Sequence, residues 1–219
     1  MLNPFARRFE ELPEILPIFP LGGVVLLPGG DLPLNIFEPR YLAMFEDSLR
    51  SQRLIGMVQP IRTEDDTVFR IGCAGRITRF EETPDGRYLV NLHGLCRFRI
   101  LQELPLAENG YRIVRPGWAA FESDMSAQSC LQLDRRYLCK LLRDYLTEQN
   151  IDLDWDLVDR VSDESLLTTL AMVCPFTASE KQALLEAPCC VSRSELFLSL
   201  LELALPKGRG GCCTSSCPH

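Results

Sequence analysis

The sequence predicts an α+β protein, with a curled β-sheet in its first half and a helical second half. Apolar and polar residues alternate over residues 69–79 and 88–100, which is typical of strands with one buried face. Helical spacing occurs once before them, over residues 39–51, where Pro39 suits the first helical position. After residue 130 helical spacing dominates. The 219 residues are 46% hydrophobic, enough to form a core without metal or disulfide support.

Three shorter strands are predicted around that first helix. Residues 16–27 are apolar and rich in β-branched side chains, and Pro28-Gly29-Gly30 predicts a turn after them. Residues 32–37 and 54–60 have the composition of two further short strands. Residues 111–114 are expected to form the last strand of the sheet.

The two long strands are expected to form a hairpin. Residues 83–86 read Thr-Pro-Asp-Gly, in which proline fixes φ and glycine can adopt a positive φ. Gly75 and Gly94 fall inside the strands and indicate a bulge or bend, as in a sheet that curls into a barrel. The face expected to be wet carries Arg87, Asn91, His93, Arg97 and Arg99.

The second half predicts four helices, over residues 130–148, 162–173, 177–186 and 192–205. Ser162 has the position of a helix cap. Thr177 with Glu180, and Ser192 with Glu195, have the spacing of capping boxes at the starts of the last two helices.

These elements divide the chain into two domains and a tail. We expect a β-barrel domain over residues 12–118 and a four-helix domain over residues 126–206. The Gly-, Ser- and Cys-rich residues 207–219 are expected to be a disordered tail.

Charge and hydropathy limit the classes of function. The chain has 23 basic and 30 acidic residues, a net charge of −7, which disfavours non-specific binding to nucleic acid. The sequence has no secretory signal core and no apolar run long enough to span a membrane, so a soluble, cytoplasmic protein is expected. In that reducing compartment the ten cysteines would stay free thiols.

Several ordered motifs resemble one known family, the N-terminal substrate-binding domain of Lon proteases, over about residues 12–205. The motifs are LPIFPL (16–21), VVLLPG (24–29), LPLNIFEPRY (32–41), IGCAGRI (71–77), GLCRF (94–98) and EKQALLE (180–186). The resemblance implies a PUA-like β pseudo-barrel followed by a helical bundle. The sequence lacks the G-x-x-x-x-G-K-[ST] run that would bind nucleotide phosphates. It therefore resembles a stand-alone bacterial protein of this class, which is related to one module of cereblon.

The function implied by the resemblance is non-catalytic. The chain would bind unfolded or apolar peptide segments, or one protein partner, and would act as an adaptor for unfolded or damaged proteins. The alternative is a PUA-like RNA-binding protein that uses Arg87, Arg97 and Arg99. A third, less favoured hypothesis is a small hydrolase centred on His93, one of only two histidines.

The candidate binding residues are Phe37, Tyr41, Arg97 and Trp118. The aromatic side chains would line an apolar groove suited to extended segments, although Tyr41 at helical spacing fits a core position equally well.

No catalytic residue, cofactor or metal is expected. Donors for zinc occur in the tail at Cys212, Cys213, Cys217 and His219, but their spacing does not match known zinc sites. The acidic residues 152–159 lack the glycine that a calcium loop requires.

Overall fold

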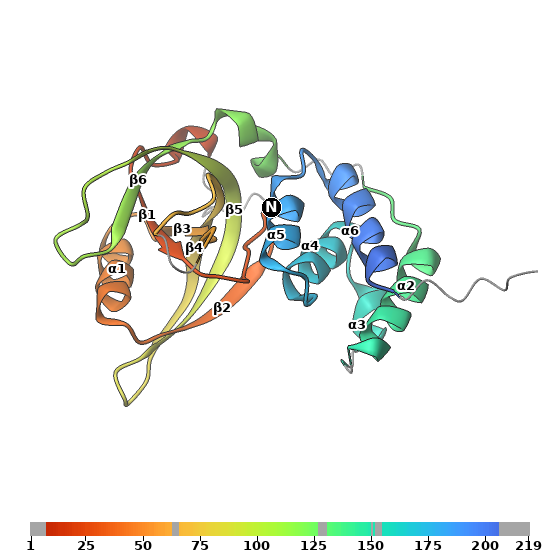
Figure 1. Cartoon of the computed structure of the whole chain (residues 1–219). Helices are drawn as coiled ribbons and strands as arrows, with labels where there is room; N and C mark the ends of the chain where they lie inside the picture. Colours follow the sequence, from red (N-terminus) through yellow and green to blue (C-terminus); the bar gives the residue numbers. More distant parts are fainter. Residues whose placement is uncertain (1–7, 63–65, 127–130, 150, 152–154, 206–219) are drawn as a thin grey trace, which may run out of the picture.

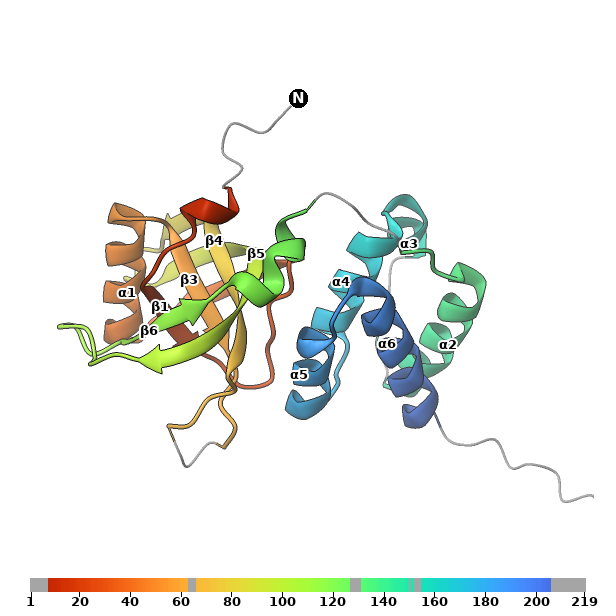
Figure 2. The same cartoon turned by 90° about the horizontal axis from the view of Figure 1, so that it is seen from above.

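The computed structural model describes residues 8–62, 66–126, 131–149, 151 and 155–205, and it confirms the α+β fold class. The β half and the helical half lie side by side, with α5 next to the sheet and α2 and α3 on the far side (Figures 1 and 2). The β half contains η1 (Phe9–Glu11), β1 (Leu16–Pro20), β2 (Asp31–Ile36), α1 (Pro39–Arg50), β3 (Leu54–Val58), β4 (Ile71–Glu82), β5 (Tyr88–Glu103) and β6 (Arg112–Gly117). After η2 (Ala119–Met125), the helical half contains α2 (Arg135–Glu148), α3 (Trp155–Arg160), α4 (Asp163–Val173), α5 (Ala178–Glu186) and α6 (Cys190–Ala204).

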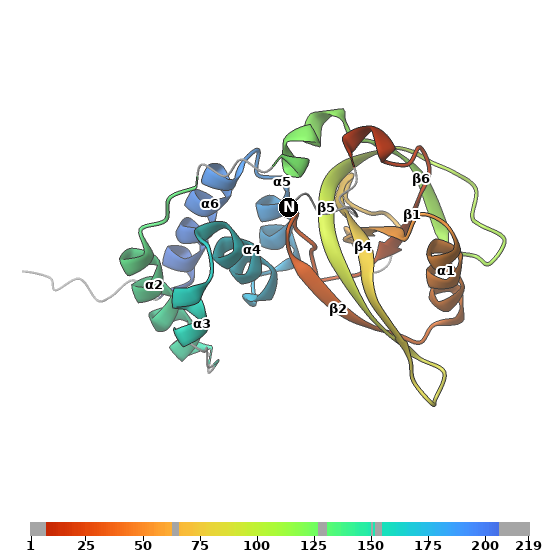
Figure 3. The ribbon, with the colours of Figure 1, turned by 180° about the vertical axis from the view of Figure 1, so that it is seen from behind.

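The six strands form one sheet in the order β2-β5-β4-β3-β1-β6. The long strand β5 also pairs with β6, so five strands close on themselves, as the expected pseudo-barrel requires. The first part of β5 pairs with β2, which stays at the edge of the sheet (Figure 3). Only the β1–β3 pair is parallel among these pairings.

The sheet bends where the sequence predicted, at Gly75 and Gly94. Ala74 pairs with Cys96 and Gly75 pairs with Gly94, so Leu95 is an extra residue in β5 and forms a bulge. A Cβ atom at Gly94 would overlap the carbonyl oxygen of Leu27. Glycine is therefore required there, because the backbone that precedes β2 crosses β5 at contact distance.

The first strand is shorter than predicted. It ends at Pro20 instead of residue 27, and Gly23 takes a φ of 72° in the turn that follows. Val25, Leu26 and Leu27 leave the sheet but remain at most 2% exposed. These residues are apolar because they are buried in the core, although the segment that contains them is not part of a strand.

The helix caps are partly as predicted. Ser162 accepts a hydrogen bond from the Ser165 amide, and Thr177 with Glu180 forms a capping box, so both of these caps are confirmed. The capping box at Ser192 is wrong, because α6 already begins at Cys190 and Ser192 lies inside its first turn. The described helical half has five helices instead of the predicted four, because residues 155–160 form a separate six-residue helix, α3.

The two halves share one apolar core and a polar junction. The larger cluster of buried apolar residues includes side chains from the barrel and from α2, α4, α5 and α6. Gln59 Nε2 donates to Gln182 Oε1 at 3.1 Å, and Gln182 Nε2 donates to the Ile71 carbonyl at 3.0 Å. Lys181 Nζ donates to the Gly23 carbonyl at 3.1 Å, and burial lowers the pKa of this lysine. The division into domains at residues 118–126 stays a prediction.

Among the residues that the structure describes, no helix combines the length and apolar character needed to cross a membrane.

We expect Gly94→Ala to lower the free energy of unfolding by about 3 kcal/mol, since its Cβ would push β5 away from the Leu27 backbone. The matched control is Gly22→Ala, whose Cβ would lie 3.6 Å from Pro60 Cγ, an ordinary contact. The control should change stability by no more than about 0.5 kcal/mol. Chemical denaturation of both variants measures the difference, and equal midpoints would contradict the close approach.

Candidate functional site

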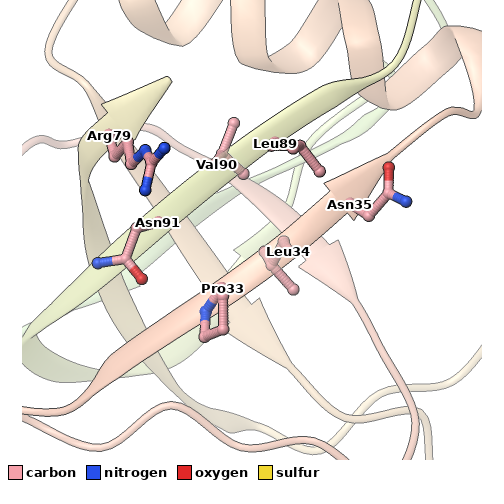
Figure 4. Close-up of a pocket in the computed structure, with 7 residues that line it drawn as sticks. All are labelled: Pro33, Leu34, Asn35, Arg79, Leu89, Val90 and Asn91. Carbon is pink, nitrogen blue, oxygen red and sulfur yellow. The ribbon is translucent and has the colours of Figure 1, made fainter. Parts of the chain in front are cut away.

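A pocket of about 580 Å³ lies over three neighbouring strands (Figure 4). We call it the strand pocket, and it is lined by Pro33, Leu34 and Asn35 of β2, Arg79 of β4, and Leu89, Val90 and Asn91 of β5. Strand register brings these residues together, because Leu34 pairs with Val90 and Asn35 pairs with Leu89.

Two polar side chains at the strand pocket, those of Asn91 and Arg79, are bonded to neighbouring side chains. Asn91 Nδ2 donates to Asp31 Oδ1 at 3.0 Å, and Arg79 Nη2 donates to Glu81 Oε2 at 2.9 Å. Leu89, in contrast, is 40% exposed. An incoming group would therefore meet the apolar surface of Leu89 beside the bonded side chains of Asn91 and Arg79.

A second, smaller pocket of about 240 Å³ continues from the first and shares Leu34 and Asn35 with it. We call it the Phe37 slot, and it is lined by Phe19, Pro20, Leu21, Leu34, Asn35, Ile36, Phe37, Glu38, Arg40 and Tyr41. The slot lies where the end of β1 faces the end of β2 and the start of α1. Both pockets adjoin β2 and share two of its residues, and we refer to them together as the groove along β2.

Two of the predicted binding residues meet at the Phe37 slot. Phe37 is 63% exposed, whereas Tyr41 is 8% exposed and its ring centroid lies 4.4 Å from that of Phe19. Phe37 therefore lies at the rim and Tyr41 forms part of the wall. Both have this position because α1 begins at Pro39, directly after β2.

The charges at the Phe37 slot balance each other. Arg40 Nη2 lies 3.1 Å from Glu38 Oε2, and the Arg40 guanidinium covers the Tyr41 ring at 4.6 Å from its centroid. Burial raises the pKa of the Tyr41 hydroxyl, so this group stays neutral. The slot thus has apolar walls and no net charge.

Arg97 lies in the junction between the two halves, and the expectation of a wet face is wrong at this residue. Its side chain is 3% exposed, and its Nε and Nη2 donate to the two carboxylate oxygens of Asp124 at 2.8 and 2.7 Å. Its Nη1 donates to the carbonyls of Leu185 at 3.1 Å and Ala187 at 2.6 Å. The alternation of apolar and polar residues in β5 correctly placed Arg97 on the face away from the barrel interior. At this residue, however, the helical half covers that face. Burial opposes the charge, yet the hydrogen bonds and charge of Asp124 outweigh it and raise the pKa of Arg97.

Trp118 is half-buried at a different part of the barrel. Its Nε1 donates to the Pro13 carbonyl at 2.9 Å, and its ring packs 5.7 Å from that of Phe98. Within the described residues, neither Trp118 nor Arg97 lines the groove along β2. The binding role of all four predicted residues stays a prediction.

Sequence reasoning missed Leu34, Asn35 and Leu89. A signal for Leu89 was present, since this leucine stands among the polar residues of the outer face of β5. Leu34 and Asn35 become part of the site only through the pairing of β2 with β5.

The residues considered for other chemistry have simpler surroundings. His93 Nδ1 lies 3.1 Å from Asp31 Oδ1 on the exposed outer face of the sheet. Burial raises the pKa of Cys96 and Cys174 to about 12, so these thiols are protonated at neutral pH. Within the described part of the chain, no group of three His, Cys, Asp or Glu side chains is placed to hold a metal ion. The cysteines and histidine of residues 207–219, with Asp152 and Asp154, lie outside the described residues.

Comparisons with known proteins agree with this fold. Residues 15–202 match the family model of the ATP-dependent protease La (LON) substrate-binding domain. The chain is 27% identical over 210 residues to Lon protease 2 of Myxococcus xanthus, covering 92% of this chain and 25% of that protein. It is 26% identical over 207 residues to the Lon protease of Anaeromyxobacter dehalogenans, covering 90% and 24%. The chain thus spans about a quarter of the length of these relatives.

Two solved structures are similar over most of their length. A Lon N-terminal domain protein from Xanthomonas campestris has a TM-score of 0.62 and 25% identity, covering 88% of this chain and 99% of that one. The N-terminal domain of a Lon protease from the Mycobacterium avium complex has a TM-score of 0.59, covering 87% and 97%. At 18% identity, the second structure supports the fold alone.

We expect Asp124→Ala to lower the free energy of unfolding by about 3–5 kcal/mol, since it leaves the buried Arg97 guanidinium without its carboxylate. Glu122→Ala is the matched control, because Glu122 belongs to the same 3-10 helix and is exposed. The control removes the same charge and should cost no more than about 0.5 kcal/mol. Thermal or urea unfolding measures both, and a similar small loss in each would show that the Arg97 contact contributes little.

Proposed function

We propose, from the premise that this chain belongs to the Lon substrate-binding domain family, that it is a substrate-recognition module for proteins. Its ligands would be exposed apolar segments of unfolded or damaged client proteins. The relatives that it matches are Lon proteases, and the matched family model is their substrate-binding domain. Recognition of this kind needs no catalytic residue and no cofactor.

The observation that carries the proposal is the groove along β2. It presents two large apolar side chains that are at least 40% exposed, Leu89 at the strand pocket and Phe37 at the Phe37 slot. Burying such a side chain against a ligand gains roughly 1.5–3 kcal/mol. Because the gain is non-directional, the groove would accept many sequences that share apolar character.

The finer part of the proposal is an adaptor role, in which the bound segment is passed to a protease. A groove that is open along one side of the barrel would let a client enter and leave without being threaded. The charge-neutral walls favour segments that a folded protein normally hides.

The RNA-binding alternative relied on Arg97, which is buried and therefore not available to phosphates. The Arg97 guanidinium is taken up by Asp124 and by backbone carbonyls, and Arg87 Nε lies 2.9 Å from Asp85 Oδ2. The net charge of −7 also opposes binding to phosphates. We therefore favour protein clients.

We expect the double variant Phe37→Ala/Leu89→Ala to bind an unfolded apolar polypeptide at least about tenfold more weakly than the wild type, because it removes the exposed apolar surface of the groove. Fluorescence anisotropy with a labelled, permanently unfolded model protein measures this affinity.

The control is Leu203→Ala, which removes a 76% exposed leucine from α6, outside the groove. It should leave the affinity unchanged. An equal loss in the control, or no loss in the double variant, would place client binding elsewhere.

A further inference from the structure

The outer edge of β2 is a second feature of the groove. Strand β2 stands at the end of the sheet order and pairs with β5 along one side. Its other side has no strand partner among the residues that the structure describes. Such an edge presents backbone donors and acceptors to whatever lies beside it.

The register shows which backbone groups point outward. The Gly94 amide donates to the Gly30 carbonyl at 2.8 Å, so the Gly30 carbonyl faces β5. In an antiparallel pair the direction of the backbone groups alternates from residue to residue. The backbone groups of Leu32 and Leu34 therefore also point toward β5, whereas those of Pro33 and Asn35 point away from it. Pro33 fits this assignment, because proline is tolerated in an edge strand where its missing N–H would point outward.

The outward groups therefore form a defined pattern. Asp31, Pro33 and Asn35 each present a carbonyl, but only Asp31 and Asn35 present an N–H as well. A ligand that covers this edge must supply donors and acceptors together, because a buried backbone group without a partner is costly. An extended peptide backbone supplies both.

The Phe37 slot lies along the same edge. Residues 34–36 and residues 19–21 both line it. In a chain paired with Asn35, the residues on either side of the paired one would project to the same sheet face as Leu34 and Ile36, beside the slot. The apolar walls and the closed Glu38–Arg40 pair match an uncharged apolar side chain.

We propose that an extended apolar peptide segment binds as an added strand on the outer edge of β2, bonded to the Asn35 backbone, with one apolar side chain in the Phe37 slot. This inference rests on the proposed function and deepens it, since it states how the client is held. Backbone bonds supply affinity that is independent of sequence, and the slot selects apolar character.

A second copy of this chain fits the edge poorly. A second copy would bring only the outward N–H groups of its own Asp31 and Asn35 to the pairing, because its Pro33 has none, and in the register that places the two Pro33 residues opposite each other neither could donate a hydrogen bond. A foreign segment has its own N–H groups to offer to the Pro33 carbonyl. The chemistry thus favours a client peptide as the occupant.

The decisive variant is Asn35→Pro, which removes the outward N–H at this position and keeps the pairing with β5. Pro33, two residues earlier, shows that the strand accepts proline in this orientation. We expect binding of a labelled apolar peptide to weaken about tenfold. Asn35→Ala keeps the N–H and should change the affinity less than about twofold. Circular dichroism and denaturation check that Asn35→Pro is folded.

Amide hydrogen exchange gives a second readout that does not depend on a variant. A saturating apolar peptide should slow exchange of the Asn35 amide, whereas the Leu34 amide, which faces β5, should exchange slowly with and without peptide. Equal affinity for folded Asn35→Pro and wild type, or unchanged exchange at Asn35 with peptide bound, would overturn strand addition and leave the proposed function in place.

Two other outcomes have separate meanings. Failure of the wild type to bind any apolar peptide would refute the proposed function itself, and strand addition with it. A dimer in sedimentation experiments that Asn35→Pro abolishes would identify a second copy as the occupant and overturn the proposal of a client peptide.

Discussion

A buried ion pair constrains where the helical half packs on the barrel. The Arg97 guanidinium from β5 is held by Asp124 of η2 and by carbonyl groups of residues 185 and 187, at the end of α5. A buried guanidinium must satisfy its N–H groups in a fixed planar geometry, so few relative positions of these three segments are allowed. The glutamine bonds between Gln59, Gln182 and Ile71 reinforce the same arrangement. The sheet face that this junction covers is thereby lost as a surface, and the groove along β2 stays open.

Most of the barrel could be predicted from local pattern, because alternation, turn residues and strand glycines are all local signals. The errors arose where an apolar or polar residue depends on something distant. Leu26 and Leu27 are apolar because they fill the core, which a strand and a crossing segment do equally well. Arg97 is polar on a face that would be wet in an isolated hairpin, and only the docking of α5 makes it buried. Ser192 has the right spacing for a cap, but Cys189 takes that position because the connection from α5 is short.

Some residues of the candidate site could likewise be predicted from local pattern, and others depend on distant contacts. Phe37 and Tyr41 could be expected together, since they stand four positions apart across the start of a helix. Leu89 joins them only through the β2–β5 register, which links positions more than fifty residues apart. Asn35 matters in our proposal through its backbone, and no side-chain pattern reports which backbone groups face outward. The bond to the Gly30 carbonyl and the missing N–H of Pro33 indicate this direction, but only once the pairing of β2 with β5 is known.

Pro33 also bears on how long a client would stay bound. By removing one outward donor from the middle of a six-residue strand, it leaves a short stretch over which an added strand can form consecutive bonds. Association rates of related complexes vary little, so fewer bonds are expressed mainly as faster dissociation. A client held in this way would exchange rapidly among copies of the protein and would be released without an energy source. Brief residence suits a module that samples many exposed segments, and it is less suited to one that stores them.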